Sequence, residues 1–182
     1  MSGRELTMLN TIIGLSDKTR LTIMAVVTLL ILLIVNSQII IKESIVNNGD
    51  TLLLRLAPRD PRSLLQGDYM ALRYAMTGEV AQAAKSAKID DGNIIVNLDP
   101  TGEASFVSLY EGQQLTETQH LLRFRKRGES VRLASDAYFF QEGEWETYSN
   151  AHFGELSVND DGFAVLTGLY DQDKNRLGDK LH

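Results

Sequence analysis

An uncharged, largely apolar stretch at residues 21–41 constrains this 182-residue chain more than any other feature. Twenty-one helical residues span about 31 Å, which matches the roughly 30 Å hydrocarbon core of a bilayer. A helix also satisfies its own backbone hydrogen bonds in lipid. Asn36, Ser37 and Gln38 interrupt the apolar run, and we expect them near the far interface or on a face that meets another helix. The stretch predicts one transmembrane helix.

Two alternatives to a retained membrane helix are a cleavable signal peptide and a buried helix of a soluble protein. Val35-Asn36-Ser37 and the isoleucines that follow provide no good cleavage site. The segment is also apolar on every side, whereas a helix at a protein surface has one apolar stripe. We therefore expect the helix to remain in the mature chain as an anchor.

The charges that flank this stretch predict its orientation. Lys18 and Arg20 precede it, whereas Lys42 and Glu43 follow it, so the basic excess lies on the N-terminal side. Basic flanks stay in the cytoplasm. The expected layout is a cytoplasmic tail (1–20), a single-pass helix (21–41), a tether (42–50), an extracytoplasmic β-rich domain (51–171) and a frayed polar tail (172–182). In a bacterium with two membranes, this layout puts the helix in the inner membrane and the β-rich domain in the periplasm.

Composition narrows the functions of the outer domain. The chain has no cysteine, which excludes zinc-finger, thiol-redox and thiol-protease chemistry. After Lys42 there are 14 basic and 22 acidic side chains, a net charge of −8. Such a domain repels phosphate backbones, so we expect no nucleic-acid partner. The basic run at residues 123–127 is interpreted as an exposed strand end and turn.

Alternation of apolar and polar residues predicts strands in the outer domain. Residues 51–57 and 69–76 both have this two-residue period. Their inward-facing residues are predicted to be Leu52, Leu54 and Leu56 in the first strand, and Met70, Leu72, Tyr74 and Met76 in the second.

Turn residues predict two hairpins. Strands 93–98 and 104–110 flank Asp99-Pro100-Thr101-Gly102, and strands 154–158 and 163–170 flank Asn159-Asp160-Asp161-Gly162. Residues 120–126 and 135–140 predict further strands, 141–152 a helix, and 77–91 either a loop or a short helix. The expected fold is mainly β: an antiparallel sandwich or partly closed barrel with one short helix.

The most distinctive motif follows the first predicted strand, at residues 59–74. Pro61 restricts Asp60 to extended conformations. Gly67 permits a tight turn, and Asp68 accepts hydrogen bonds from backbone N–H groups of that turn. Tyr69 faces away from the Leu72 and Tyr74 side, so it either covers the turn or is presented to a partner.

This block resembles the GDYXXLXY family of membrane-anchored bacterial proteins. The residues that fill the named positions are Gly67, Asp68, Tyr69, Leu72 and Tyr74. Downstream, residues 139–143 with Gly143, Tyr148, and residues 153–156 with Gly154 resemble the second half of the family, with Phe153 in place of an expected tyrosine. The resemblance spans residues 49–170. It implies an N-terminal anchor and a polytopic membrane protein as genomic neighbour, but no activity, because the family is uncharacterised.

The enzymatic alternative is a membrane-bound hydrolase. Residues 63–68 resemble part of a signal-peptidase motif, but the nucleophile position falls on Arg59, and a guanidinium cannot replace an activated hydroxyl. Ser63 with Lys85 or Lys88 as base has no supporting spacing. The carboxylates available for acid and base catalysis are Asp60, Asp68, Glu142, Glu144 and Glu155.

Metal and cofactor sites have little support. His120, His152 and His182 lack ligand spacing. Oxygen ligands for calcium occur at residues 159–162, but a hairpin turn explains these residues better. We therefore expect no cofactor.

A binding site is the remaining interpretation. Its candidate residues are Arg59, Asp60, Arg62, Asp68 and Tyr69 in one group and Glu142, Tyr148 and Glu155 in the other. If the fold joins them, arginines opposite carboxylates form a groove for a peptide or partner loop. Alternatively, Arg59 or Arg62 pairs with Glu142 or Glu155 only to stabilise the fold. The prediction is an extracytoplasmic accessory or binding domain that acts with a polytopic membrane protein.

Overall fold

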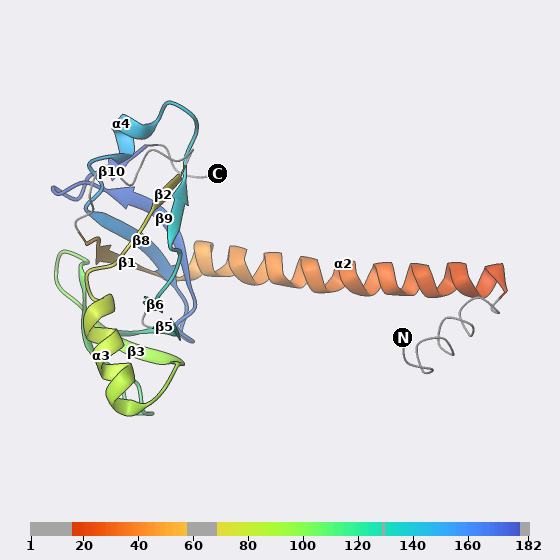
Figure 1. Cartoon of the computed structure of the whole chain (residues 1–182), viewed down its shortest axis with the longest axis horizontal. Coiled ribbons are helices and arrows are strands. Elements are labelled where there is room, and N and C mark those ends of the chain that lie inside the picture. The colour runs from red at the N-terminus through yellow and green to blue at the C-terminus, as the bar shows by residue number, and fades with distance from the viewer. Residues whose placement is uncertain (1–15, 58–68, 129, 179–182) are drawn as a thin grey trace. The chain divides into compact units, whose positions relative to one another are not determined.

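The computed structural model describes residues 16–57, 69–128 and 130–178, which divide into two compact units after Lys42 (Figure 1). The helices are α2 (Asp17–Asn48), α3 (Thr77–Ala87) and α4 (Trp145–Tyr148). The strands are β1 (Asp50–Arg55), β2 (Tyr69–Ala71), β3 (Asp91–Leu98), β4 (Ala104–Leu109), β5 (Gln119–Arg127), β6 (Ser130–Arg132), β7 (Ala137–Phe139), β8 (Phe153–Val158), β9 (Ala164–Tyr170) and β10 (Arg176–Leu177).

Helix α2 contains the whole predicted membrane segment. It has 32 residues and is the one helix in the described part of the chain that is long and apolar enough to cross a membrane. Ser16 begins it, since its Oγ accepts a hydrogen bond from the Thr19 backbone N–H at 3.3 Å. The Asn36 side chain donates to the Leu32 carbonyl and the Ser37 hydroxyl to the Ile34 carbonyl, both at 2.8 Å. These bonds lower the cost of placing both polar groups in lipid.

The second unit starts at Glu43, so it includes the last residues of α2. Residues 43–48, part of the expected tether, are therefore helical. Ile45 is buried against the β domain. Ser157 of β8 donates its hydroxyl to the Ile45 carbonyl at 2.6 Å. The same carbonyl accepts the Gly49 backbone N–H at 2.9 Å, so both of its acceptor positions are used where α2 ends.

The second unit is built from antiparallel sheets, as predicted. One sheet has the order β1-β8-β9-β10, a second has the order β4-β3-β5-β6, and β2 and β7 form a two-stranded ribbon. Both predicted hairpins are confirmed, as β3–β4 and β8–β9. Gly162 takes the positive φ of +84° that the second turn requires. The expected class, mainly β after an N-terminal apolar helix, is confirmed.

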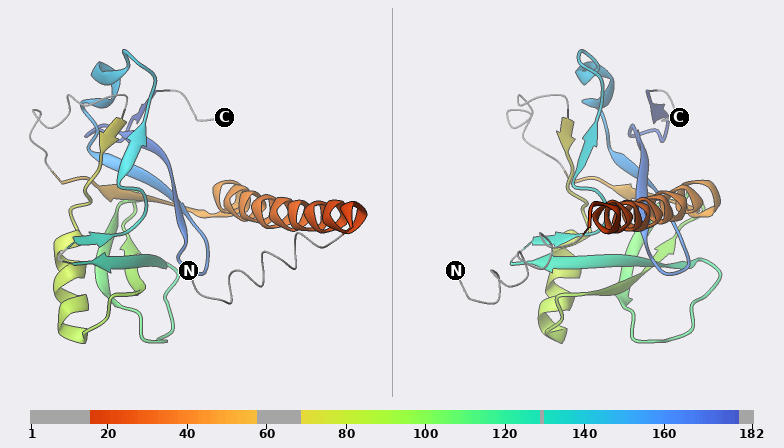
Figure 2. Two further views of the ribbon diagram at one scale, coloured as in Figure 1. Left: turned by 45° about the vertical axis from the view of Figure 1, so that its right-hand side comes forward. Right: turned by 90° about the vertical axis from the view of Figure 1, so that its right-hand side faces the viewer.

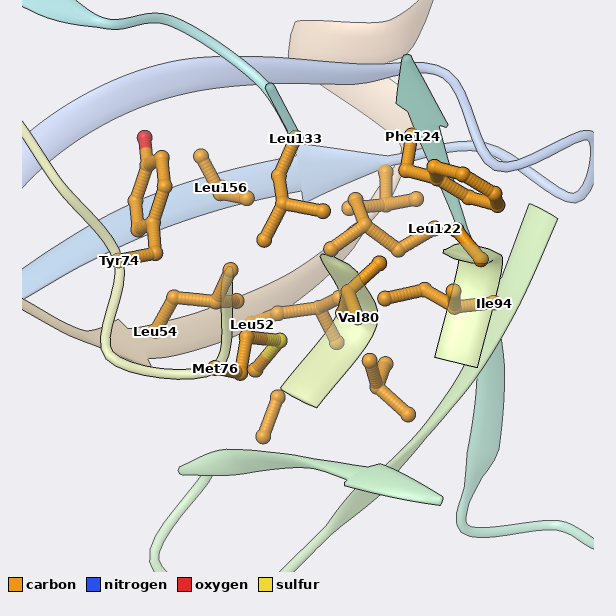
Figure 3. Packing of buried hydrophobic residues seen from close by; sticks show 14 residues of the cluster. Leu52, Leu54, Tyr74, Met76, Val80, Ile94, Leu122, Phe124, Leu133 and Leu156 are labelled. Atoms are coloured by element: carbon orange, nitrogen blue, oxygen red, sulfur yellow. The ribbon is translucent and has the colours of Figure 1, made fainter. Parts of the chain in front are cut away.

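The main core lies between the two four-stranded sheets and α3. Figure 3 shows Leu52 of β1, Val80 of α3 and Leu122 of β5 pointing toward one another, and each is fully buried. Val80 and Ala84 lie four residues apart on the buried face of α3 (Figure 2 shows this helix beside the sheet). The ambiguous segment at residues 77–91 is therefore a helix through Ala87, because its apolar face covers the sheet.

Three segments differ in extent from the predictions. The strand predicted at 69–76 ends at Ala71, although its inward-facing residues Met70, Leu72, Tyr74 and Met76 are all buried. The helix predicted at 141–152 is only α4, because the chain turns at Gly143 (φ +90°) and must return to pair β8 with β1. The polar tail at 172–182 is not frayed at its start, since β10 pairs with β9.

Candidate functional site

The two halves of the motif meet in the β2–β7 ribbon. Tyr69 lies opposite Phe139, and Met70 lies opposite Tyr138. Because neighbouring residues of a strand point to opposite faces, Met70 and Tyr138 are buried while Tyr69 and Phe139 are 40% and 71% exposed. The exposed rings have centroids 5.7 Å apart. We call Tyr69 and Phe139 the exposed aromatic pair.

The inner face of the ribbon belongs to a second hydrophobic cluster. Tyr148 of α4 stacks on Phe140 at 5.3 Å between centroids and contacts Tyr138 at 5.1 Å. Burial and a hydrogen bond with Tyr148 raise the pKa of Tyr138 to about 12. Tyr148, a predicted binding residue, is only 4% exposed, so it supports the ribbon from beneath.

The later motif residues are structural. Tyr74 is buried in the main core, where its hydroxyl donates to the Ser135 carbonyl at 3.0 Å and burial raises its pKa. A Cβ at Gly154 would lie 3.3 Å from the Tyr74 ring, so glycine leaves room for that ring. Leu72 is buried in the second cluster, and Gly143 forms the turn before α4.

Glu155, another predicted binding residue, is the centre of a polar network on β8. Its carboxylate accepts hydrogen bonds from Thr167 at 2.7 Å, Tyr170 at 2.7 Å and Arg176 at 2.6 Å. Burial alone would raise the pKa of Glu155, but these three hydrogen bonds outweigh it and hold the pKa below its ordinary value. Glu155 is therefore an ionised structural partner, poorly suited to donate a proton at neutral pH.

Arg176 completes this network from β10. Its guanidinium packs over Gly168, where a Cβ would lie 2.7 Å from Cζ. Its Nε is buried and has no hydrogen-bond partner among the described residues. Nothing in the local sequence marks Arg176, because the polar stretch at 172–182 predicts a frayed end. The only sequence signal for the pair is the opposite charge of Glu155 on β8 and Arg176 on β10. It indicates a contact only once the strand order is known.

Of the first predicted group of binding residues, the described part of the chain includes only Tyr69. Arg59, Asp60, Arg62 and Asp68, together with Gly67 of the motif, lie outside the described residues. Glu155 pairs with Arg176, whereas Glu142 is exposed and makes no ion pair in the described part of the chain. Tyr69 is therefore the one described member of the first group, and it is presented on the surface.

The residues of the catalytic and metal hypotheses are dispersed or have structural contacts. Ser63 lies outside the described residues, and Lys85 and Lys88 are exposed around the end of α3. Glu144 accepts a hydrogen bond from the Gln141 backbone at 3.0 Å. No group of three acidic or histidine side chains in residues 16–57, 69–128 and 130–178 has metal-binding geometry. Asn159 stabilises its turn by accepting from the Phe163 N–H at 2.8 Å.

Fold and motif together define a class of protein: a β-rich domain carried by an N-terminal helix long and apolar enough to anchor it in a membrane. The GDYXXLXY protein family matches residues 31–169, and the chain belongs to this family. The match covers both strands of the ribbon and most of α2. No curated protein and no solved structure matches the chain.

Proposed function

We propose that this protein is a membrane-anchored accessory domain that binds a polytopic membrane protein through the exposed aromatic pair. The observation that carries the proposal is that the motif places Tyr69 and Phe139 side by side on the outside of a ribbon whose inner face is buried. A tightly packed inner face limits the motion of the outer one. Rigid, partly exposed aromatic side chains are typical centres of protein interfaces, since they bury a large area at a small entropic cost.

The proposed location is the inner membrane of a bacterium, with the N-terminus in the cytoplasm and the β domain in the periplasm. Lys18 and Arg20 before the apolar run favour this orientation. Anchoring in the same bilayer raises the effective concentration of domain and partner. A contact centred on two aromatic rings is then strong enough to hold domain and partner together in the membrane, although it would be weak between free proteins.

Site-specific photo-crosslinking in intact membranes tests the proposal. A photoreactive amino acid replaces Phe139 in one variant and Phe163 in a control, because Phe163 is also exposed but lies in the β8–β9 turn. We expect an adduct with one integral membrane protein from position 139, its loss in the Tyr69→Ser background, and no such adduct from position 163. Equal yields at both positions would contradict the proposal.

A further inference from the structure

A groove of about 600 Å³ opens at one end of the β2–β7 ribbon. Its wall on one side is the chain from Leu72 to Ala75, which continues directly from β2. The other lining residues include Ser130, Val131 and Arg132 of β6, Thr77, Gly78 and Ala81 of α3, and Asp136 just before β7. The groove is therefore close along the chain to the exposed aromatic pair, since Leu72 follows Tyr69 by three residues and Asp136 precedes Phe139 by three.

One side of the groove is an edge strand of the described sheet. Strand β6 ends the β4-β3-β5-β6 sheet and, among the described residues, pairs only with β5, through Arg132 opposite Arg125 and Ser130 opposite Arg127. The free edge of such a strand presents N–H and C=O groups in the spacing that another extended chain needs. Peptides bind to many domains by adding a strand at such an edge.

The charge of the groove differs from that of the domain. Arg132 pairs with Asp136 at 2.7 Å, but the guanidinium of the exposed Arg73 makes no hydrogen bond or ion pair with the described residues. Because Arg132 and Asp136 pair with each other, Arg73 leaves the groove lining with one net positive charge in a domain with a net charge of −8, which favours an anionic ligand.

We infer that the groove binds an extended acidic segment of the partner membrane protein. The segment adds a strand to β6 and places an Asp or Glu carboxylate at Arg73, where a guanidinium binds carboxylates with two parallel hydrogen bonds. The inference rests on the proposed function, because it supplies the second contact of the same partner. A phospholipid headgroup matches the charge but has no strand backbone to pair with β6.

The test uses the full-length chain in intact membranes, with a photoreactive amino acid in place of Ser130. Ser105 is the matched control, since it is an exposed serine of β4, the edge strand at the other side of the same sheet. We expect position 130, and not 105, to crosslink to an integral membrane protein at a peptide that contains Asp or Glu. Arg73→Glu is expected to lower the yield about tenfold or more, while Arg73→Lys keeps most of it.

Where position 130 does crosslink, four results would still overturn the inference: an adduct with phospholipid, an adduct with this chain's own residues, an adduct at a peptide without acidic residues, and a yield unchanged by Arg73→Glu. Circular dichroism of each purified variant establishes that it is folded. If position 139 crosslinks and position 130 does not, the groove inference fails while the proposed function stands. If neither position crosslinks, the proposed function itself fails.

Discussion

At the scale of single residues, two glycines differ in how much space surrounds them for a side chain. A Cβ at Gly49 would lie 2.6 Å from the Ile45 carbonyl oxygen, 2.6 Å from Ser157 Oγ and 2.8 Å from the Val158 carbonyl oxygen. Two of these atoms are backbone atoms and cannot move independently. Gly78, in contrast, has nothing within 4 Å of the corresponding position.

Gly49→Ala is therefore expected to lower the free energy of unfolding by about 1–3 kcal/mol, the usual cost of forcing a methyl group into packed surroundings. Gly78→Ala, in helix α3, is expected to be neutral or to stabilise by up to about 1 kcal/mol. Denaturant unfolding of the full chain in detergent, followed by fluorescence of the single tryptophan, Trp145, measures both. Equal stability of the two variants would show that the backbone around Gly49 moves enough to accommodate a methyl group.

Glu155 predicts a pH dependence of stability. Its hydrogen bonds hold its folded pKa below the unfolded value of about 4.3, so the unfolded state binds more protons near pH 4. The stabilisation is present above that pH and is lost as pH falls through the folded pKa. We expect Glu155→Gln to lower the unfolding free energy by about 1–3 kcal/mol at pH 7, with the difference from wild type shrinking below pH 4. A difference that stays constant down to pH 3 would contradict this role.

At the scale of elements, the β2–β7 ribbon has one buried face and one exposed face. The buried face packs on α4 and contributes to folding, whereas the exposed face holds the aromatic pair that the proposed function assigns to binding. Alternation along one strand therefore separates the residues that stabilise the fold from those of the proposed interface.

Two neighbouring substitutions separate these faces. Tyr138→Ala removes a buried ring and is expected to cost about 3–5 kcal/mol of stability. Phe139→Ala removes an exposed ring and is expected to change stability by about 0.5 kcal/mol or less. Unfolding midpoints of both variants provide the measurement. A large loss for Phe139→Ala would mean that this ring serves the fold, which removes the basis of the proposed interface.

At the scale of the whole molecule, the chain consists of an apolar helix suited to anchoring and an acidic β domain, and the proposed orientation places this domain in the periplasm. Because the chain contains no cysteine, single cysteines at Ser16 and Ser105 report the two sides of the membrane without background. A membrane-impermeant maleimide is expected to label Ser105→Cys in cells whose outer membrane is permeabilised, and Ser16→Cys only after lysis. The reverse pattern would place the β domain in the cytoplasm.

Local patterns of the sequence determined the apolar helix, both hairpins and the inward-facing residues of the first strands. Each depends on a local property: the length of an uncharged run, a period of two, or a turn residue with positive φ. The short extent of α4 was beyond this reasoning, because the return of the chain to β1 overrides helical spacing.

Only the tertiary structure determined which side chains meet. Tyr69 and Phe139 lie on different strands far apart in the chain, Arg176 reaches Glu155 across 21 residues, and Ser157 reaches Ile45 across 112. Such contacts depend on strand order and register, which no local pattern encodes. The sequence by itself therefore predicted an anchored β domain with an outward Tyr69, and the fold supplied Phe139 as its neighbour and the groove beside them.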